Sequence, residues 1–139
     1  MNGDQLHQVA IEIACNLPFS EQSQPFGPEC DVFKILEKVF LLVGEGTGTK
    51  MITVKCDPYK SQEYQELYPF IIPGYHMNKK HWISITPHKN LTRDLLQDLI
   101  RDSYDLVVKK LPLKDQKKIK QPIILNMKTA TIRSPFLFQ

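Results

Sequence analysis

The chain has 139 residues, of which 42% are hydrophobic and 24% are charged, and its formal net charge is +3. These totals are typical of one globular domain and exclude a disordered chain. No run of about eighteen apolar residues occurs, which excludes a membrane-spanning helix, and the N-terminus lacks the pattern of a signal peptide, so we expect a cytoplasmic protein.

An amphipathic helix is predicted at the N-terminus. Apolar residues recur there at steps of three and four: Leu6, Val9, Ala10, Ile13, Ala14 and Leu17. This spacing places them on one face of a helix. We expect Asp4 to cap that helix and Pro18 to end it. Residues 19–30, which contain two prolines and Gly27, predict a loop.

Three strands are predicted next. Asp31–Ile35 and Val39–Gly44 are rich in β-branched and aromatic residues and predict a hairpin, and Met51–Cys56 predicts a third strand. Their short connections indicate an antiparallel meander. The glycine-rich loop 44–49 lacks the lysine and the spacing of a phosphate-binding loop, so we interpret it as a flexible hairpin loop.

The pair Asp57-Pro58 predicts the start of a second helix, with the aspartate as N-cap and the proline at the first helical position. This helix is expected to end near Leu67. A loop is expected over Phe70–Asn78, followed by a strand over Lys80–Thr86.

Thr92 is expected to cap a last amphipathic helix that runs to Leu111. Beyond it, Leu113–Gln121 is rich in lysine and is interpreted as a linker, and a strand is expected over Ile123–Ile132.

Catalytic and metal sites are not favoured. The three cysteines, Cys15, Cys30 and Cys56, form no CxxC pair, so we expect reduced thiols. His76 and His81 are five residues apart, a spacing that suits neither a helix nor a strand for two metal ligands. No nucleophile motif occurs. We therefore expect neither an enzyme nor a bound metal or cofactor.

Nucleic-acid binding has better candidates. Lysines able to contact phosphates and aromatic residues able to stack on bases occur in the first 111 residues: Lys34, Lys55, Lys79 and Lys80, with Tyr75 and His76. Trp82 could also stack on bases, but Trp82 and His81 lie in a predicted strand beside apolar residues, so we expect structural roles for both. We expect Trp82 to belong to the core and Trp82→Ala to cost about 3–5 kcal/mol of stability.

The charge of the chain is unevenly distributed. Residues 1–108 carry ten basic and fourteen acidic residues, a net charge of −4, whereas residues 109–139 carry eight basic residues and one acidic residue, a net charge of +7. The C-terminal lysines are therefore further candidates for phosphate contacts: Lys109, Lys110, Lys117 and Lys118.

Over residues 1–111 the chain resembles the bacterial YjbR/MmcQ family. The resemblance is carried by six segments: Pro25-Phe26-Gly27-Pro28, Val32-Phe33-Lys34, Lys38-Val39-Phe40, Val54-Lys55-Cys56-Asp57-Pro58, Pro73-Gly74-Tyr75-His76-Met77-Asn78-Lys79-Lys80-His81-Trp82 and Asp102-Ser103-Tyr104-Asp105-Leu106-Val107. The motif residues that we expect to have structural roles are Gly27, Asp57, Pro58, Pro73, Gly74, His81, Trp82, Ser103 and Tyr104.

The resemblance implies a two-layer α+β fold, in which a twisted antiparallel sheet has helices packed mainly on one face. It also implies DNA binding through a double-wing arrangement. We expect a domain over residues 1–111 and a basic extension over residues 112–139. The expected partner is DNA, bound through its phosphates, and the alternative is a protein-interaction or chaperone-like adaptor. We expect a monomer or a weak dimer without a membrane partner.

Overall fold

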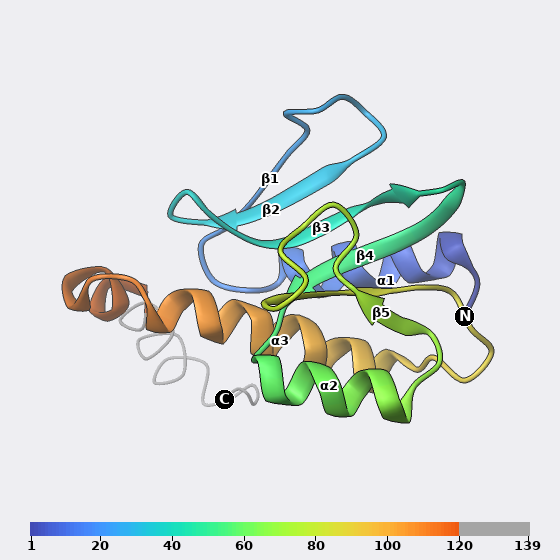
Figure 1. Ribbon diagram of the computed structural model, residues 1–139. Helices are drawn as coiled ribbons and strands as arrows, with labels where there is room; N and C mark the ends of the chain where they lie inside the picture. The colour runs from blue at the N-terminus through green and yellow to red at the C-terminus, as the bar shows by residue number, and fades with distance from the viewer. Residues whose placement is uncertain (120–139) are drawn as a thin grey trace, which may run out of the picture. The chain divides into compact units, whose positions relative to one another are not determined.

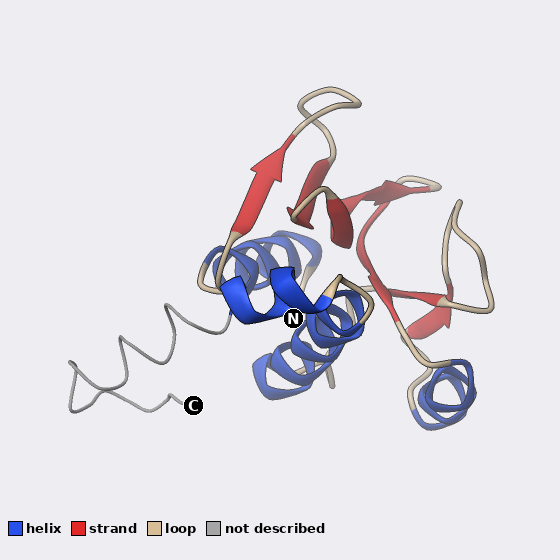
Figure 2. Ribbon diagram, turned by 90° about the vertical axis from the view of Figure 1, so that its left-hand side faces the viewer, coloured by secondary structure: helices blue, strands red, loops and turns tan. Residues whose placement is uncertain are grey.

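The structure, a computed structural model, describes residues 1–119. The chain divides into two compact units, Met1–Val107 and Val108–Gln139. The first unit has two layers, a six-stranded antiparallel sheet and the helices that pack on one of its faces (Figures 1 and 2). The α+β fold implied by the resemblance is therefore confirmed.

The helices and strands follow in this order: α1 Gly3–Cys15, β1 Ser20–Ser23, β2 Asp31–Ile35, β3 Lys38–Gly46, β4 Thr49–Lys55, α2 Pro58–Leu67, β5 Ile71–Pro73, β6 Trp82–Ile85 and α3 Arg93–Lys109. Across the sheet the strand order is β1-β2-β3-β4-β6-β5, and every neighbouring pair is antiparallel.

Two strands lie where loops were predicted. β1 is a polar strand with three exposed residues that pairs along its whole length with β2, and β5 is a three-residue strand that pairs with β6. Both lie at the edges of the sheet. Their strand conformation comes from pairing with one neighbour rather than from alternating apolar side chains, so the loop predictions for these residues were wrong.

The core lies between the sheet and the helices. The largest fully buried side chains come from α1, α3 and four strands: Leu6, Phe33, Ile35, Phe40, Leu41, Ile52, Ile83, Ile85, Leu96 and Ile100. Burying such side chains is the main favourable contribution to folding.

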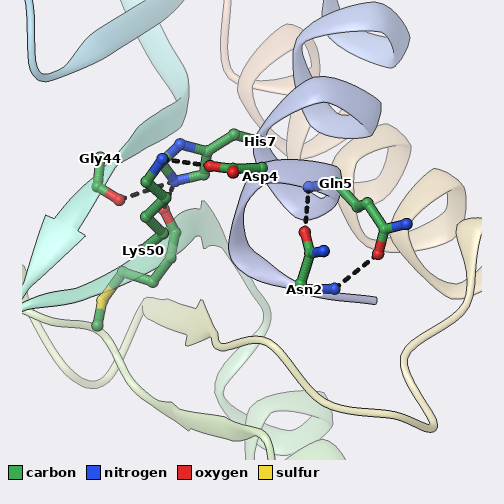
Figure 3. A network of polar contacts seen from close by, with 7 residues as sticks. Asn2, Asp4, Gln5, His7, Gly44 and Lys50 are labelled. Carbon is green, nitrogen blue, oxygen red and sulfur yellow. Dashed lines mark hydrogen bonds and ion pairs between the residues drawn. The ribbon is translucent and has the colours of Figure 1, made fainter.

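The first turn of α1 is capped by Asn2 and not by Asp4 (Figure 3). Asn2 Oδ1 accepts a hydrogen bond from the Gln5 amide at 2.8 Å, and Gln5 Oε1 accepts one from the Asn2 amide at 2.8 Å, which forms a capping box. Asp4 instead pairs with Lys50 of β4. His7 Nε2 lies between two backbone carbonyl oxygens of the β3–β4 hairpin, at 2.9 and 3.1 Å. These contacts fix α1 to the hairpin.

Ser103 joins α3 to the sheet. Its hydroxyl donates a hydrogen bond to Phe40 O at 2.6 Å and accepts one from the Lys55 amide at 2.9 Å. The last residue pair of the β3–β4 ladder at this end is Leu41 with Val54. The serine hydroxyl therefore links the two strands at the position where their direct pairing stops.

Tyr104, the next residue, holds α3 against the chain segment before β1. Its hydroxyl donates to Pro18 O at 2.6 Å, and its ring packs edge-on against Phe40 with 5.4 Å between the ring centroids. Burial raises the pKa of this phenol above its ordinary value. The adjacent serine and tyrosine on α3 thus have structural roles.

The N-cap predicted for α2 is confirmed. Asp57 Oδ1 accepts a hydrogen bond from the Tyr59 amide at 3.1 Å, and Pro58 occupies the first helical position. We expect Asp57→Ala to lower the free energy of unfolding by about 1 kcal/mol, because a first-turn amide loses its partner. Urea denaturation measures this change. Asp57→Asn, which keeps an acceptor oxygen, is the control; equal losses in the two variants would contradict the capping role.

The outer edge of β5 presents no free amide donor over its three residues. The hydrogen bond from the Gly74 amide to Trp82 O (2.9 Å) shows that even-numbered residues direct their backbone groups toward β6, so the nitrogens of Ile71 and Pro73 point outward. The Ile71 amide donates to Tyr68 O at 3.1 Å, and proline has no amide hydrogen.

In the second unit a helix covers residues 113–119, where a linker was predicted. Gln116 Nε2 donates to the carbonyl oxygens of Lys109 and Leu111 at 3.1 and 2.8 Å, which stabilises the turn before that helix. The predicted strand Ile123–Ile132 lies outside the described residues. Within residues 1–119, the helices are all too short or too polar to cross a membrane.

Candidate nucleic-acid interface

One face of the sheet carries no helix. Lys50 of β4 pairs with α1, which places Ile52 and Val54, two and four residues later, on the helix-covered face. The alternate residues of β4 therefore lie on the opposite, helix-free face, and so do their register partners on β6. The pairs on this face are Thr53 with Ser84 and Lys55 with Trp82.

Two of the predicted phosphate contacts lie on the helix-free face. Lys34 of β2 lies between Phe33 and Ile35, both of which are fully buried on the helix-covered face. Lys55 of β4 lies on the same side as Lys34, and both are half-buried. Glu21 on β1 is the register partner of Lys34, so an acidic residue lies opposite this lysine on the neighbouring strand.

Trp82 is half-buried at the edge of this face and is not part of the core. Lys55 Nζ lies 5.8 Å from the centroid of the indole ring, which is the geometry of a cation–π contact. Because the ring is only partly buried, the loss on Trp82→Ala is expected to fall below the range for a buried tryptophan. His81 is also half-buried, and its backbone oxygen accepts a hydrogen bond from the Cys56 amide at 2.8 Å.

The loop between β5 and β6 folds over the helix-free face (Figure 1). The Tyr75 amide donates to Ser84 Oγ at 2.9 Å, and Ser84 Oγ lies 2.7 Å from Thr53 Oγ1. The Tyr75 ring packs on Gly46, where a Cβ atom would lie 2.7 Å from two ring carbons. The ring therefore requires glycine at position 46.

Two features hold this loop in place. A Cβ atom on Gly74 would lie 2.7 Å from Trp82 Cβ and 2.9 Å from Trp82 O, so only glycine fits beside the strand. Lys79 Nζ donates to the Gly74 carbonyl at 2.9 Å. Lys79 thus closes the loop on itself, a contact that the sequence does not indicate, and its contact with a phosphate stays a prediction.

The top of the loop is exposed. His76 has a backbone φ of 59°, in the left-handed region, and its ring centroid lies 4.0 Å from that of Tyr75. Lys80 is exposed, and its amide is held by Asn78 Oδ1 at 2.9 Å. An aromatic pair and a lysine therefore stand beside the strand that carries Trp82.

The loop before β4 is shorter than the predicted loop over residues 44–49. Gly44–Gly46 belongs to β3, and only Thr47 and Gly48 form the turn, with φ values of 51° and 79°. Positive φ at both central residues is the type I′ turn that fits the twist of a hairpin. Gly27, with φ of 108°, has the same conformational role in the loop before β2.

The remaining candidates lie in the second unit: Lys109, Lys110, Lys117 and Lys118. All four side chains are exposed. Sequence reasoning missed Thr53 and Ser84, whose hydroxyls hold the β5–β6 loop on the sheet, whereas Ser103 was expected to have a structural role. Ser84 alternates with Ile83 and Ile85 in the sequence, and this polar residue within an apolar strand was the available signal.

Charge differs between the two layers of the first unit. Within residues 1–107, the three helices and the Asp57 cap carry nine acidic and three basic residues, a net charge of −6. The strands and the other loops carry five acidic and seven basic residues, a net charge of +2. The negative charge of the domain is therefore concentrated in the helices.

Comparison with known proteins places the chain in a family. The YjbR family model matches residues 15–106. The Escherichia coli O157:H7 protein YbdF is 51% identical over 120 residues, which cover 86% of this chain and 98% of YbdF. A crystal structure of the Deinococcus radiodurans protein DR2400 is 34% identical and covers 86% of this chain and 88% of that one, with a TM-score of 0.71. A crystal structure of a Pseudomonas syringae protein is 26% identical, and the match covers 76% of this chain and 98% of that one, with a TM-score of 0.59. The chain shares its fold with these two solved structures, and it belongs to the YjbR family.

Proposed function

We propose that this protein binds DNA through the helix-free face of its sheet. The observation that carries the proposal is the separation of charge between the layers, which leaves the acidic residues mainly on the helices and brings Lys34 and Lys55 together on the opposite face. Residues 1–108 carry a net charge of −4, but most of their acidic residues lie in the helices, away from this face.

The lysines on and beside this face have different roles. Lys34 and Lys55 are half-buried, so their side chains lose less freedom when a phosphate binds than fully exposed lysines would. Lys80 adds an exposed ammonium group at the loop. Lys79 is a positioning residue, because its ammonium holds the loop carbonyl of Gly74.

We also propose that the protein binds without catalysing a reaction. The buried cysteine, Cys56, has its pKa raised to about 11, with burial as the largest cause and the nearby carboxylates of Asp57 and Asp102 adding to it. At neutral pH such a thiol stays protonated, and the thiolate is the form that acts as a nucleophile.

Replacing Lys34 and Lys55 by glutamine is expected to reduce the salt dependence of binding to mixed-sequence duplex DNA. The slope of log K against log salt is negative, and the loss of two phosphate contacts makes it less negative by about 1.8. Fluorescence anisotropy with a labelled duplex, measured at about 50 and 200 mM salt, gives this slope.

The matched control replaces Lys60 of α2 and Lys89 of the loop before α3 by glutamine, which removes the same charge from two exposed positions outside the strands. An equal change of slope in the control would assign the effect to net charge and contradict the proposed face. Glu21→Gln is expected to have the opposite sign and to tighten binding, because it removes the carboxylate of Lys34's register partner. Absence of binding by the full chain near 50 mM salt would refute DNA binding altogether.

A protein-interaction role is the second candidate, and α2 favours it. Ser61 is its one buried residue, whereas Tyr59 and Leu67 are 82% and 70% exposed. Exposed apolar side chains on a helix are used for binding other proteins. If DNA binding fails, a defect of Tyr59→Lys and Leu67→Lys in forming a complex would support this role.

A further inference from the structure

Building on the proposed DNA binding, we infer that the helix-free face binds single-stranded nucleic acid in preference to duplex, with an unpaired base stacked on Trp82. The inference deepens the proposed function by naming the form of nucleic acid that the face recognises. Three observations support it. Three aromatic rings lie on the helix-free side, the helices lie on the other face and are acidic, and the tip of the β3–β4 hairpin is unsuited to a groove of duplex DNA.

The aromatic rings are gathered on the helix-free side. Trp82 is half-buried on the face itself, and Tyr75 and His76 form a ring pair on the loop that is hydrogen-bonded to the same strand through Ser84. Bases in a duplex already stack on one another, so exposed aromatic faces are useful mainly for unpaired bases.

Lys55 is placed to act together with Trp82. Its ammonium nitrogen lies 5.8 Å from the ring centroid. A phosphate attracted by Lys55 would bring its own nucleotide beside the indole, so the charge contact and the stacking contact would be made by neighbouring groups of one strand. Lys34 lies two strands away from Lys55, about 10 Å across the sheet, and can hold a phosphate further along the strand.

The elements that usually read a duplex are unsuited here. A helix or a two-stranded ribbon must enter the major groove. Helices α1, α2 and α3 lie on the other face and, with the Asp57 cap, carry nine of the fourteen acidic residues of residues 1–107. The β3–β4 ribbon ends in Thr47 and Gly48, with Glu45 on one strand and Lys50 already paired with Asp4. The hairpin tip over residues 45–50 therefore brings no unpaired cation to a groove, and the helices of residues 1–107 carry a net negative charge.

The test uses the fluorescence of Trp82, which is the one tryptophan of the chain. The full-length protein is titrated with an oligo(dT) of about 20 nucleotides, which exceeds the site size of a small stacking surface, and with a duplex of the same length. We expect oligo(dT) to quench the tryptophan emission and to bind at least about tenfold more tightly than the duplex, which should bind without quenching.

Variants separate stacking from charge. Trp82→Ala is expected to weaken oligo(dT) binding by about 5- to 150-fold and to weaken duplex binding by a smaller factor, because only the single strand loses a stacked base, whereas Trp82→Phe should retain most of the affinity because a phenyl ring still stacks. Circular dichroism checks that each variant is folded. If Trp82→Ala fails to fold, the exposed His76 replaces it, and His76→Ala should weaken oligo(dT) binding selectively.

The outcomes distinguish the two proposals. Duplex binding as tight as oligo(dT) binding, without quenching by either, overturns the preference for single strands but leaves DNA binding intact. Failure of both ligands to bind overturns both proposals. Quenching by oligo(dT) and oligo(rU) alike supports a site for unpaired bases of either nucleic acid, and quenching by oligo(dT) alone supports a site restricted to DNA.

Discussion

Ser103→Ala is expected to lower the free energy of unfolding by about 2–4 kcal/mol, although it removes a single oxygen atom. The hydroxyl serves two strands at once, as donor to Phe40 O and as acceptor from the Lys55 amide. Ser103 itself is fully buried. Its loss would remove one hydrogen bond from a backbone carbonyl and one from a backbone amide, and breaking hydrogen bonds to groups shielded from water costs more than the mean hydrogen bond suggests.

Ser20→Ala is the matched control. Ser20 Oγ is buried and, within residues 1–119, has no hydrogen-bond partner, so removing it should change stability by less than about 0.5 kcal/mol or raise it slightly. Urea denaturation of both variants gives the comparison. Equal losses would mean that the serine hydroxyls matter through packing alone, and the bridging role of Ser103 would then be wrong.

Replacing Lys109, Lys110, Lys117 and Lys118 together by glutamine is expected to have the largest effect on DNA binding. Contacts of these four lysines with phosphates contribute about −3.6 to the salt slope, which corresponds to about 150-fold in affinity between roughly 50 and 200 mM salt. With two further contacts on the sheet face, the full chain should show a slope of about −5.4 and the four-lysine variant about −1.8.

This variant also tests where discrimination arises. Exposed lysines reach phosphates without reading bases, so their loss should weaken oligo(dT) and duplex DNA by similar factors. The ratio of the two affinities should therefore stay as it is in the full chain. An unchanged slope in the four-lysine variant would assign the DNA contacts entirely to residues 1–107.

The elements that the sequence predicts correctly are those with a local pattern of their own. α1 and α3 carry apolar residues at helical steps, β2, β3 and β4 are rich in β-branched and aromatic residues, and Asp57 and Pro58 mark the start of α2. β1 and β5 were missed because an edge strand is defined by the backbone of its neighbour. The N-cap of α1 could have been found, since Asn2 and Gln5 have the spacing of a capping box.

The candidate site was predicted in part for a similar reason. Alternation along β2 and β4 assigns Lys34 and Lys55 to one side of their strands, but only the register shows that it is the same side and that no helix covers it. Lys79 could not be assigned from the sequence, because its partner is a carbonyl whose position depends on the folded loop. The roles of Ser84 and Ser103 likewise depend on contacts between distant segments.

The closed outer edge of β5 limits how sheets of this protein can join. Strand addition needs free amide donors, and within residues 1–107 the end of the sheet at β5 has none over Ile71–Pro73. Extension is thus restricted to β1. If two copies joined there, β5 would form both ends of the enlarged sheet, and a third copy would find no strand to pair with. Such association stops at a closed pair and does not grow into a filament.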